Sequence, residues 1–181
     1  DILDFSKIEA GEATVMPSAV YIPDAIHACV TMIETRAEMK DISIDIDLPD
    51  ELPQLYVDVR QQKQILLNLL SNAVKFTRQN TSVILEAMIS DIGEINFQVS
   101  DSGEGMTAND IKRVQEPFVR LQGAVTSSEE GTGLGLAITK RLTEIHGGRL
   151  QLHSETSVGT TAIVIFPKER TAKALASQNR H

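Results

Sequence analysis

The sequence predicts a two-layer α+β sandwich, in which a mixed, largely antiparallel sheet packs on about three helices. Strand-like segments come mostly in pairs joined by short turns, and amphipathic helices separate the pairs. This order favours α+β over a doubly wound parallel sheet. The chain has 181 residues, 41% of them apolar and 23% charged. That is enough for one folded domain with an appendage, and it is untypical of a disordered chain.

Charge and cysteine content exclude several functional classes. The formal net charge is −8, whereas a protein held to nucleic acid by phosphate contacts needs a basic surface. The single cysteine, Cys29, cannot form an intrachain disulfide, and no cysteine–histidine cluster suggests zinc. No segment approaches the ~20 apolar residues that span a bilayer. We therefore expect a cytoplasmic fragment of a longer protein, with no nucleic-acid contact and no membrane contact of its own.

The first half of the chain predicts three helices and three strands. Apolar residues at helical spacing over 1–10 are followed by Gly11, which suits the C′ position of a helix. Pro23 suits the first turn of a second helix that runs to about residue 40. A third, strongly amphipathic helix spans about 60–77. The strand-like segments of this half are 13–21, 43–48 and 55–59.

The second half predicts two hairpins and two further helices. Strands over 83–89 and 94–100 flank the turn Asp91-Ile92-Gly93. The long segment from 101 to 131 has little periodicity apart from one short helix near 110–114. A helix over about 134–145 ends at Gly147-Gly148. Strands over 149–153 and 160–166 form the closing hairpin, and the tail after Pro167 is polar and loose.

A stripe of polar residues runs along the predicted helix 60–77. At about 100° per residue, Asn68, Asn72 and Lys75 fall within one narrow stripe, opposite an apolar arc. The stripe could be the solvated face of an amphipathic helix, although asparagine is a poor helix former. Amide carbonyls are also suitable ligands for Mg²⁺, and lysine suits phosphate oxygens. The helix therefore carries a candidate metal–phosphate site.

The segment VSDSGEGM, residues 99–106, carries a second candidate motif. Asp101 continues the inward alternation of Phe97 and Val99, so its carboxylate points toward the core unless the strand is irregular. Burying it is costly unless a donor meets it. Alternatively, Asp101 bonds its own backbone in a turn, which is common in Asp-Ser-Gly sequences. Gly103 and Gly105 allow close approach of the backbone to something flat or charged.

The segment EEGTGLGLAITKRL, residues 129–142, carries a third motif. Gly131, Gly133 and Gly135 precede an apolar helix, so free backbone N–H groups and the positive helix end face the loop. This arrangement predicts an anion cradle for phosphates. A P-loop would require a lysine that is missing, and a dinucleotide-binding fingerprint would require a preceding strand where the sequence is a polar loop.

Taken in order, these motifs resemble the N, G1, F, G2 and G3 boxes of the sensor histidine kinases. Their catalytic domain belongs to the ATPase superfamily that includes gyrase B and the mismatch-repair ATPases. The resemblance covers roughly 17–167, and DILDFSKIEAGE resembles the end of the second helix of the dimerisation and phosphoacceptor domain. The implied organisation is a truncated helix end over 1–12, a catalytic ATP-binding domain with a mobile ATP lid over 13–167, and a flexible tail over 168–181.

At the phosphate end, the resemblance implies that Asn72 binds Mg²⁺ with help from Asn68, while Lys75 contacts phosphate. The lid residues that would cradle the phosphates of ATP are Gly131, Thr132, Gly133, Leu134 and Gly135.

At the adenine end, the resemblance implies that Asp101 accepts a hydrogen bond from the adenine amino group. Thr160, at the start of the last strand, would support that contact through water. Phe76 would lie against the base, and Gly103 and Gly105 complete the ATP-binding positions.

The resemblance also implies an activity and partners. A histidine kinase transfers the γ-phosphoryl group of Mg-ATP to a histidine in its own dimerisation domain, within a homodimer, and then to the aspartate of a response-regulator receiver domain. None of the four histidines lies in a long dimerisation helix before an acidic residue. His146, for example, ends a predicted helix, where it suits the negative helix end. We therefore expect the phosphoacceptor upstream of Asp1.

Two departures from the family pattern keep alternatives open. Glu116-Pro117-Phe118 matches the F box only partly, because Gln115 stands where the family often has a second aromatic residue. Asn68 stands where hydrolytic relatives have a glutamate, and an amide cannot act as the base that activates water. Rapid ATP hydrolysis is therefore not expected. The alternative functions are an ATP-gated clamp-type ATPase of the same superfamily and a degenerate nucleotide-binding module.

Overall fold

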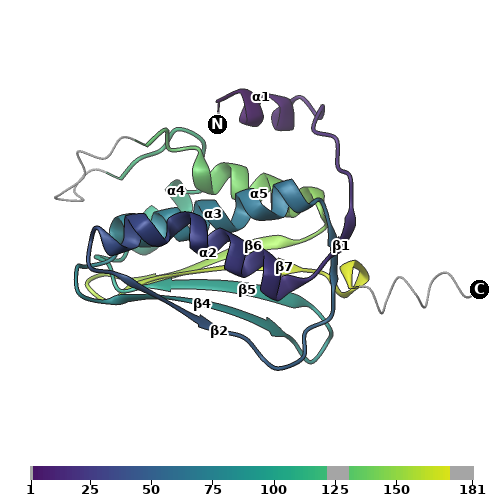
Figure 1. The fold of residues 1–181 in the computed structure, drawn as a ribbon. Helices are drawn as coiled ribbons and strands as arrows, with labels where there is room; N and C mark the ends of the chain where they lie inside the picture. The colour runs from purple at the N-terminus through teal and green to yellow at the C-terminus, as the bar shows by residue number, and fades with distance from the viewer. Residues whose placement is uncertain (1, 122–130, 172–181) are drawn as a thin grey trace, which may run out of the picture.

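The structure, a computed structural model, describes residues 2–121 and 131–171. Three helices cover one face of a five-stranded sheet (Figure 1): α2 (Ile22–Glu38), α3 (Val59–Phe76) and α5 (Gly135–Ile145). This arrangement confirms the predicted α+β sandwich. The shorter helical elements are α1 (Ile2–Glu9), α4 (Ala108–Arg113) and the 3₁₀ turn η1 (Lys168–Arg170). Of these, α1 lies against α5. No helix in the described part of the chain is long and apolar enough to cross a membrane.

The sheet is mixed and largely antiparallel, as predicted. Its strand order is β2-β4-β5-β7-β6, in which β2 runs parallel to β4 and every other neighbouring pair is antiparallel. The strands are β2 (Ser43–Asp47), β4 (Ser82–Ile89), β5 (Ile95–Asp101), β6 (Arg149–Glu155) and β7 (Gly159–Phe166). Both hairpins predicted from the sequence, β4–β5 and β6–β7, are present. The pairing of β5 with β7 places Asp101, the last residue of β5, beside the start of β7.

Two further strands form a separate small sheet. They are β1 (Ser18–Val20) and β3 (Leu55–Val57), which pair antiparallel. Although 43–48 and 55–59 follow each other closely in the sequence, they join different sheets. A bridge between Leu55 and Thr171 also ties this small sheet to the segment after β7.

The core lies between the helices and the inner face of the sheet, and α3 is at its centre. This helix packs against α2, α5, β4 and β5. Phe97 of β5 and Phe166 of β7 meet edge to face in the sheet, with ring centroids 6.0 Å apart. The buried residues of α3 are Gln62, Ile65, Leu66, Leu69, Leu70, Ala73 and Val74. The broad apolar arc predicted for this helix is therefore its core face.

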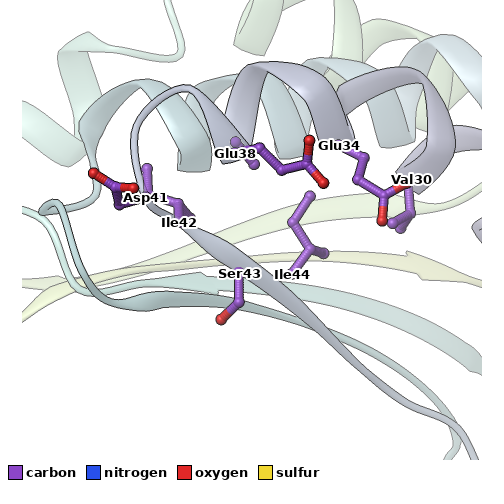
Figure 2. Close-up of a pocket in the computed structure, with 8 residues that line it drawn as sticks. Val30, Glu34, Glu38, Asp41, Ile42, Ser43 and Ile44 are labelled. Carbon is purple, nitrogen blue, oxygen red and sulfur yellow. The ribbon is translucent and has the colours of Figure 1, made fainter.

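A groove of about 530 Å³ separates the end of α2 from the free edge of β2 (Figure 2). Glu34 and Glu38 of α2 reach down toward β2 over Ile44, which lies in the groove. Asp45 and Asp47 of β2 are exposed on the outer face of the sheet. Charged side chains along an edge strand oppose pairing with another chain, so this edge is protected against sheet-to-sheet association.

The single cysteine is part of the core. The Cys29 side chain of α2 is fully buried, and its Sγ lies 3.9 Å from the backbone carbonyl of Lys63 in α3. Burial raises the pKa of this thiol to about 11, against a smaller opposing effect of the positive charge of Lys63. The thiolate, which is the reactive form, is therefore both scarce and inaccessible in the folded chain.

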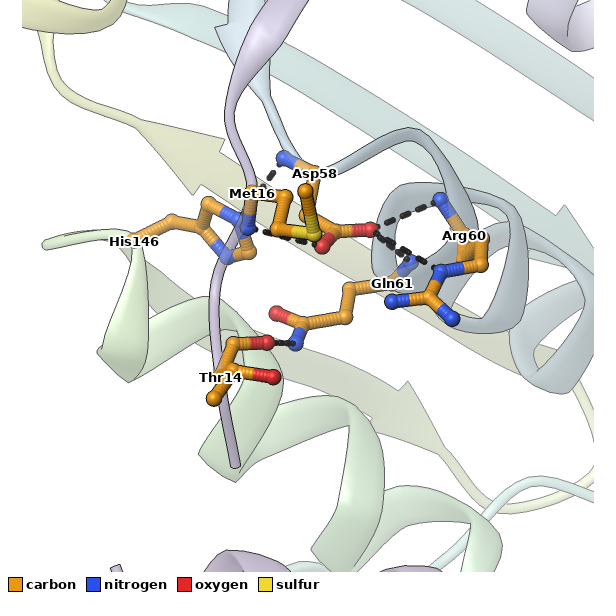
Figure 3. Close-up of polar contacts among 6 residues, drawn as sticks. All are labelled: Thr14, Met16, Asp58, Arg60, Gln61 and His146. Carbon is orange, nitrogen blue, oxygen red and sulfur yellow. Dashed lines mark hydrogen bonds and ion pairs between the residues drawn. The ribbon is translucent and has the colours of Figure 1, made fainter. Parts of the chain in front are cut away.

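His146 is also buried, directly after the last residue of α5. Its Nδ1 lies 2.8 Å from the carbonyl oxygen of Leu142, and its Nε2 accepts a hydrogen bond of 3.1 Å from the backbone N–H of Asp58 (Figure 3). Because a carbonyl can only accept, Nδ1 carries the proton and the imidazole is neutral. Burial lowers the pKa of His146 below its ordinary value, although the bond to Leu142 opposes this.

We expect Cys29 to resist thiol reagents in the folded chain. A chromogenic disulfide reagent should react with it only after addition of denaturant, because the raised pKa leaves little thiolate and the core excludes the reagent. Absorbance of the released chromophore measures the reaction. Fast labelling under native conditions would contradict the packing of α2 against α3.

We also expect stability to fall as the pH drops below about 6.5, the ordinary pKa of an unfolded histidine. Below this pH the unfolded chain binds a proton that folded His146 does not, so stability is lost until the pH reaches the lowered pKa of the folded residue. The slope for one proton is at most about 1.4 kcal/mol per pH unit. Urea unfolding of the unsubstituted chain and of His146→Gln measures it. Equal slopes in the two chains would contradict this interpretation.

Candidate nucleotide site

Polar side chains of three strands meet at one end of the sheet. Asp101, the last residue of β5, pairs with Thr160 of β7, which in turn pairs with Ser154 of β6. The hydroxyl oxygens of Ser154 and Thr160 are 2.8 Å apart, and the backbone N–H of Met106 donates to Ser154 at 2.8 Å. These residues share the side of the sheet occupied by buried Val99. The apolar inner face therefore ends in a polar row.

The Asp101 carboxyl is mostly buried and satisfied by backbone donors. Its Oδ1 accepts a hydrogen bond of 2.8 Å from the N–H of Gly103. Burial raises the pKa of Asp101 above its ordinary value, against the opposing effect of the backbone bonds from Gly103 and Thr160. Both interpretations of Asp101 thus hold together, because the side chain faces inward and also bonds its own turn. Its remaining acceptor capacity suits an amino group.

Gly103 and Gly105 allow this turn to lie directly on other backbone segments. A Cβ on Gly103 would collide with the carbonyl of Phe76 at the end of α3, and a Cβ on Gly105 would collide with the carbonyl of Glu155. Gly105 also has a φ of +67°, which favours glycine. The structure accounts for both glycines by close approach within the chain, and this approach fixes the Asp101 turn between α3 and β6.

Asn68 and Asn72 of α3 both face the start of α5. The Asn68 amide donates to the carbonyl of Gly135 at 3.2 Å and to the hydroxyl of Thr139 at 3.4 Å. A Cβ on Gly135 would lie 3.9 Å from both Asn68 and Asn72. The two asparagines are therefore not on an open solvated face. Since the Asn68 nitrogen is engaged, its carbonyl oxygen is the atom left to meet a cation.

The end of α3 joins the metal–phosphate stripe to the Asp101 turn. Lys75 places its Nζ 5.2 Å from the centre of the Phe76 ring, and a Cβ on Gly131 would lie 3.1 Å from the same nitrogen. Phe76 is 44% exposed as a residue. Because Phe76 is one turn beyond Asn72, a single helix connects the two ends of the predicted site.

The glycine-rich segment before α5 is held by the residues around Phe118. Gly133 has a φ of +71°, and its carbonyl accepts a hydrogen bond of 3.1 Å from the N–H of Phe118. The Thr132 hydroxyl accepts a bond of 3.3 Å from the N–H of Leu134, which is fully buried. The first two residues of the EEGTG segment, with the rest of 122–130, lie outside the described residues.

The residues present fit an anion and a magnesium ion. The first-turn N–H groups of α5 have no side-chain cap among the described residues, so they can meet negative charge. No three acidic, histidine or cysteine residues of the described chain come together as a metal cage. Mg²⁺ is commonly held by one or two protein oxygens together with phosphates and water. The amide oxygens of Asn68 and Asn72 are suited to that role.

Two residues that organise the site, Ser154 and Arg78, lie outside the sequence motifs. Ser154 continues the inward alternation of Leu150 and Leu152, and this alternation is the sequence signal that identifies it. Arg78 donates to the carbonyls of Gly103 (3.5 Å) and Ser157 (2.7 Å). No local pattern indicates this second contact, because it joins the end of α3 to the β6–β7 turn.

Known proteins are similar to this chain in sequence and in fold. Residues 57–170 match the family described as histidine kinase-, DNA gyrase B-, and HSP90-like ATPase. The chain is 40% identical over 170 residues to the non-motile and phage-resistance protein of Caulobacter vibrioides, covering 92% of the chain and 20% of that protein. It is 33% identical over 178 residues to the cell-division control histidine kinase PdhS of Brucella ovis, covering 94% and 17%. The chain thus spans about a fifth of these relatives.

A solved structure gives the same likeness in three dimensions. The crystal structure of full-length ShkA in complex with AMPPNP superposes with a TM-score of 0.82 at 31% sequence identity, covering 92% of this chain and 34% of that one. The architecture built above from α2, α3, α5 and the mixed sheet is therefore also found in a known protein that was solved in complex with AMPPNP.

We expect Gly105→Ala to destabilise the chain by about 2 kcal/mol or more, because the new methyl group meets both an unfavourable φ and the Glu155 carbonyl. Gly11→Ala is the matched control, since Gly11 has a φ of +70° but open space around it; its cost should be about 1 kcal/mol. Denaturant unfolding at constant m-value gives both numbers. Equal losses would show that strain alone, without the close approach, explains Gly105.

Proposed function

We propose that the parent protein of this chain is a two-component sensor histidine kinase, because the chain belongs to the family of histidine kinase-, DNA gyrase B- and HSP90-like ATPases. The chain is the ATP-binding catalytic domain, of the histidine kinase type. The parent would transfer the γ-phosphoryl group of ATP to a histidine of its own dimerisation domain. From there the group would pass to an aspartate of a response-regulator receiver domain in the cytoplasm.

One observation carries this proposal: α3 joins two chemically different ends of a single site. Its amides at Asn68 and Asn72 face the glycine-led start of α5, and its last residue, Phe76, packs on the turn of Asp101. A nucleotide has the same polarity, with anionic phosphates at one end and a flat base with an amino group at the other. The spacing along α3 therefore supports a nucleotide as the ligand.

At the adenine end, Asp101 would accept a hydrogen bond from the exocyclic amino group. The backbone bonds from Gly103 and Thr160 hold the carboxyl in place, so no rotamer has to be ordered when the base binds. Thr160 and Ser154 would hold a water beside this contact. Phe76, which is partly exposed, would cover one face of the base.

At the phosphate end, Asn72 and Asn68 would hold Mg²⁺ through their amide oxygens, and Lys75 would contact phosphate. Bound Mg²⁺ supplies charge neutralisation on the phosphate oxygens. The N-terminus of α5 and the glycines of 131–135 would cradle the same group with backbone N–H donors. Transfer to histidine would then rest on positioning and on charge neutralisation.

The clamp-type ATPase is the less favoured alternative. A hydrolytic enzyme needs a group that takes a proton from water. Asn68 stands at the expected position, and its amide nitrogen donates to Gly135 and Thr139. An amide in this geometry orients a ligand but takes no proton, which supports phosphoryl transfer over hydrolysis.

We expect the chain to bind an ATP analogue with an affinity that Mg²⁺ increases. We expect Asp101→Asn to lower that affinity by about tenfold or more, since a hydrogen bond to a charged group contributes about 1.5–3 kcal/mol. Asn72→Ala should instead remove the increase in affinity that Mg²⁺ produces, and it should leave the affinity without metal unchanged. Asp91→Asn, in the exposed β4–β5 turn, is the matched control. Calorimetry with and without Mg²⁺ measures all four chains.

Two outcomes would overturn this assignment. Binding that is indifferent to Asp101 would mean that the adenine end is elsewhere. Steady release of phosphate from ATP well above that of the Asn72→Ala chain would favour the clamp-type ATPase.

A further inference from the structure

The segment that joins α1 to β1, residues 10–17, is called here the linker, and it is held along the start of α3 by its backbone (Figure 3). The Met16 N–H donates to Oδ2 of Asp58 at 3.0 Å, and Nε2 of Gln61 donates to the carbonyl of Thr14 at 3.2 Å. Met16 itself is 72% exposed. Polar groups at the start of α3 thus hold the linker at Thr14 and at Met16, although Met16 is not buried.

The two carboxylate oxygens of Asp58 hold two different segments. Oδ1 accepts from the N–H groups of Arg60 at 2.9 Å and Gln61 at 3.2 Å, and so caps α3. An N-cap needs only one side-chain oxygen, and asparagine or serine would provide it. The second oxygen serves the linker. The Asp58 side chain is only 3% exposed, in a setting where a charge without donors would be costly.

His146 holds the backbone of Asp58. The backbone N–H of Asp58 is bound to Nε2 of His146, whose other nitrogen is bound to α5. Burial alone would raise the pKa of the Asp58 carboxyl, but the N–H groups of Met16, Gln61 and Arg60 lower it below its ordinary value. Asp58 is therefore a charged, fixed anchor between α3, α5 and the linker.

Beyond the linker, α1 lies against the phosphate end of the site. Glu9 pairs with Arg141 of α5 at 2.9 Å. Phe5 meets Phe118 edge to face, with ring centroids 6.2 Å apart. Phe118 in turn donates its N–H to Gly133. The anchored linker thus places α1 next to the segment proposed to cradle phosphate.

We propose that Asp58 is a positioning residue for phosphoryl transfer, because by holding the linker at Met16 it fixes where the chain preceding the catalytic domain meets the phosphate end. The inference rests on the proposed function, in which that preceding chain carries the phosphoacceptor histidine. A tether that is fixed close to the site raises the effective concentration of what it carries. Released at Met16, the linker becomes a flexible chain, and productive encounters become rarer.

Met16→Pro in the parent protein tests this directly. Proline removes the N–H that Asp58 binds, while Asp58 and its cap of α3 remain intact. The backbone of Met16 is already biased toward an extended conformation, because Pro17 follows it. Met16→Ala is the matched control, since it removes the same side chain and keeps the N–H. Asp58→Asn is an independent variant that keeps a capping oxygen and replaces the other oxygen by a donor.

We expect the rate constant for formation of phosphohistidine to fall about tenfold or more in Met16→Pro and Asp58→Asn, because small misplacements of reacting groups are costly. The KM for ATP should stay within about twofold, since nucleotide contacts are unchanged. Met16→Ala should match the unsubstituted protein in both. Spin labels at Lys7→Cys and Lys168→Cys of this chain, where buried Cys29 is protected, should give one narrow distance distribution that broadens only in Met16→Pro and Asp58→Asn.

Each other result overturns the proposal in a distinct way. An unchanged rate constant in Met16→Pro would show that the anchor does not position the upstream chain. A rise in KM together with a lower melting temperature would reduce Asp58 to a folding role. If the unsubstituted parent binds nucleotide but forms no phosphohistidine, the proposed function fails with it, and the spin-label distances still show whether the anchor exists.

Discussion

The burial of one broad face of α3 is the constraint on which the rest of the structure depends. Leu66 and Leu70 are fully buried between the sheet and the helices on either side. Successive residues of a helix are turned by about 100° around its axis. Once the leucines are buried, the rotation of α3 about its axis is set, and Asn68 and Asn72 lie at the boundary with α5. The polar chemistry of the site is thus a consequence of how the apolar core is packed.

Much of this could be predicted from local patterns. Helical periodicity found α3 and its asparagine stripe, and the alternation of Phe97 and Val99 indicated which way Asp101 points. These signals are local, because neighbouring residues in one element share a face regardless of the rest of the fold. The bounds of most elements moved by only one or two residues, which is the usual uncertainty at element ends. The sequence allows Asp101 either to bond its own turn or to point its carboxyl inward. In the structure the side chain does both.

The remaining features depend on contacts between distant segments, which no local pattern carries. The pairing of β3 with β1 rather than with its neighbour β2 is one example. The glycines of the Asp101 turn are another: sequence shows that Gly103 and Gly105 permit close approach, but not that Phe76 and Glu155 are what they approach. A third example is Oδ2 of Asp58, which binds the N–H of Met16. The sequence around a capping aspartate is the same whether or not its other oxygen binds a distant segment.

The parallel pairing of β2 with β4 has a consequence for how the chain folds. The hairpins β4–β5 and β6–β7 join strands separated only by short turns, so closing them costs little loop entropy. By contrast, β3 and all of α3 lie between β2 and β4 in the chain. We therefore expect β2 to join the sheet only after α3 has docked. Until then the backbone N–H and C=O groups along that edge of β4 have no strand partner. The interval before β2 arrives is therefore the period in which a newly made chain is most exposed to aggregation.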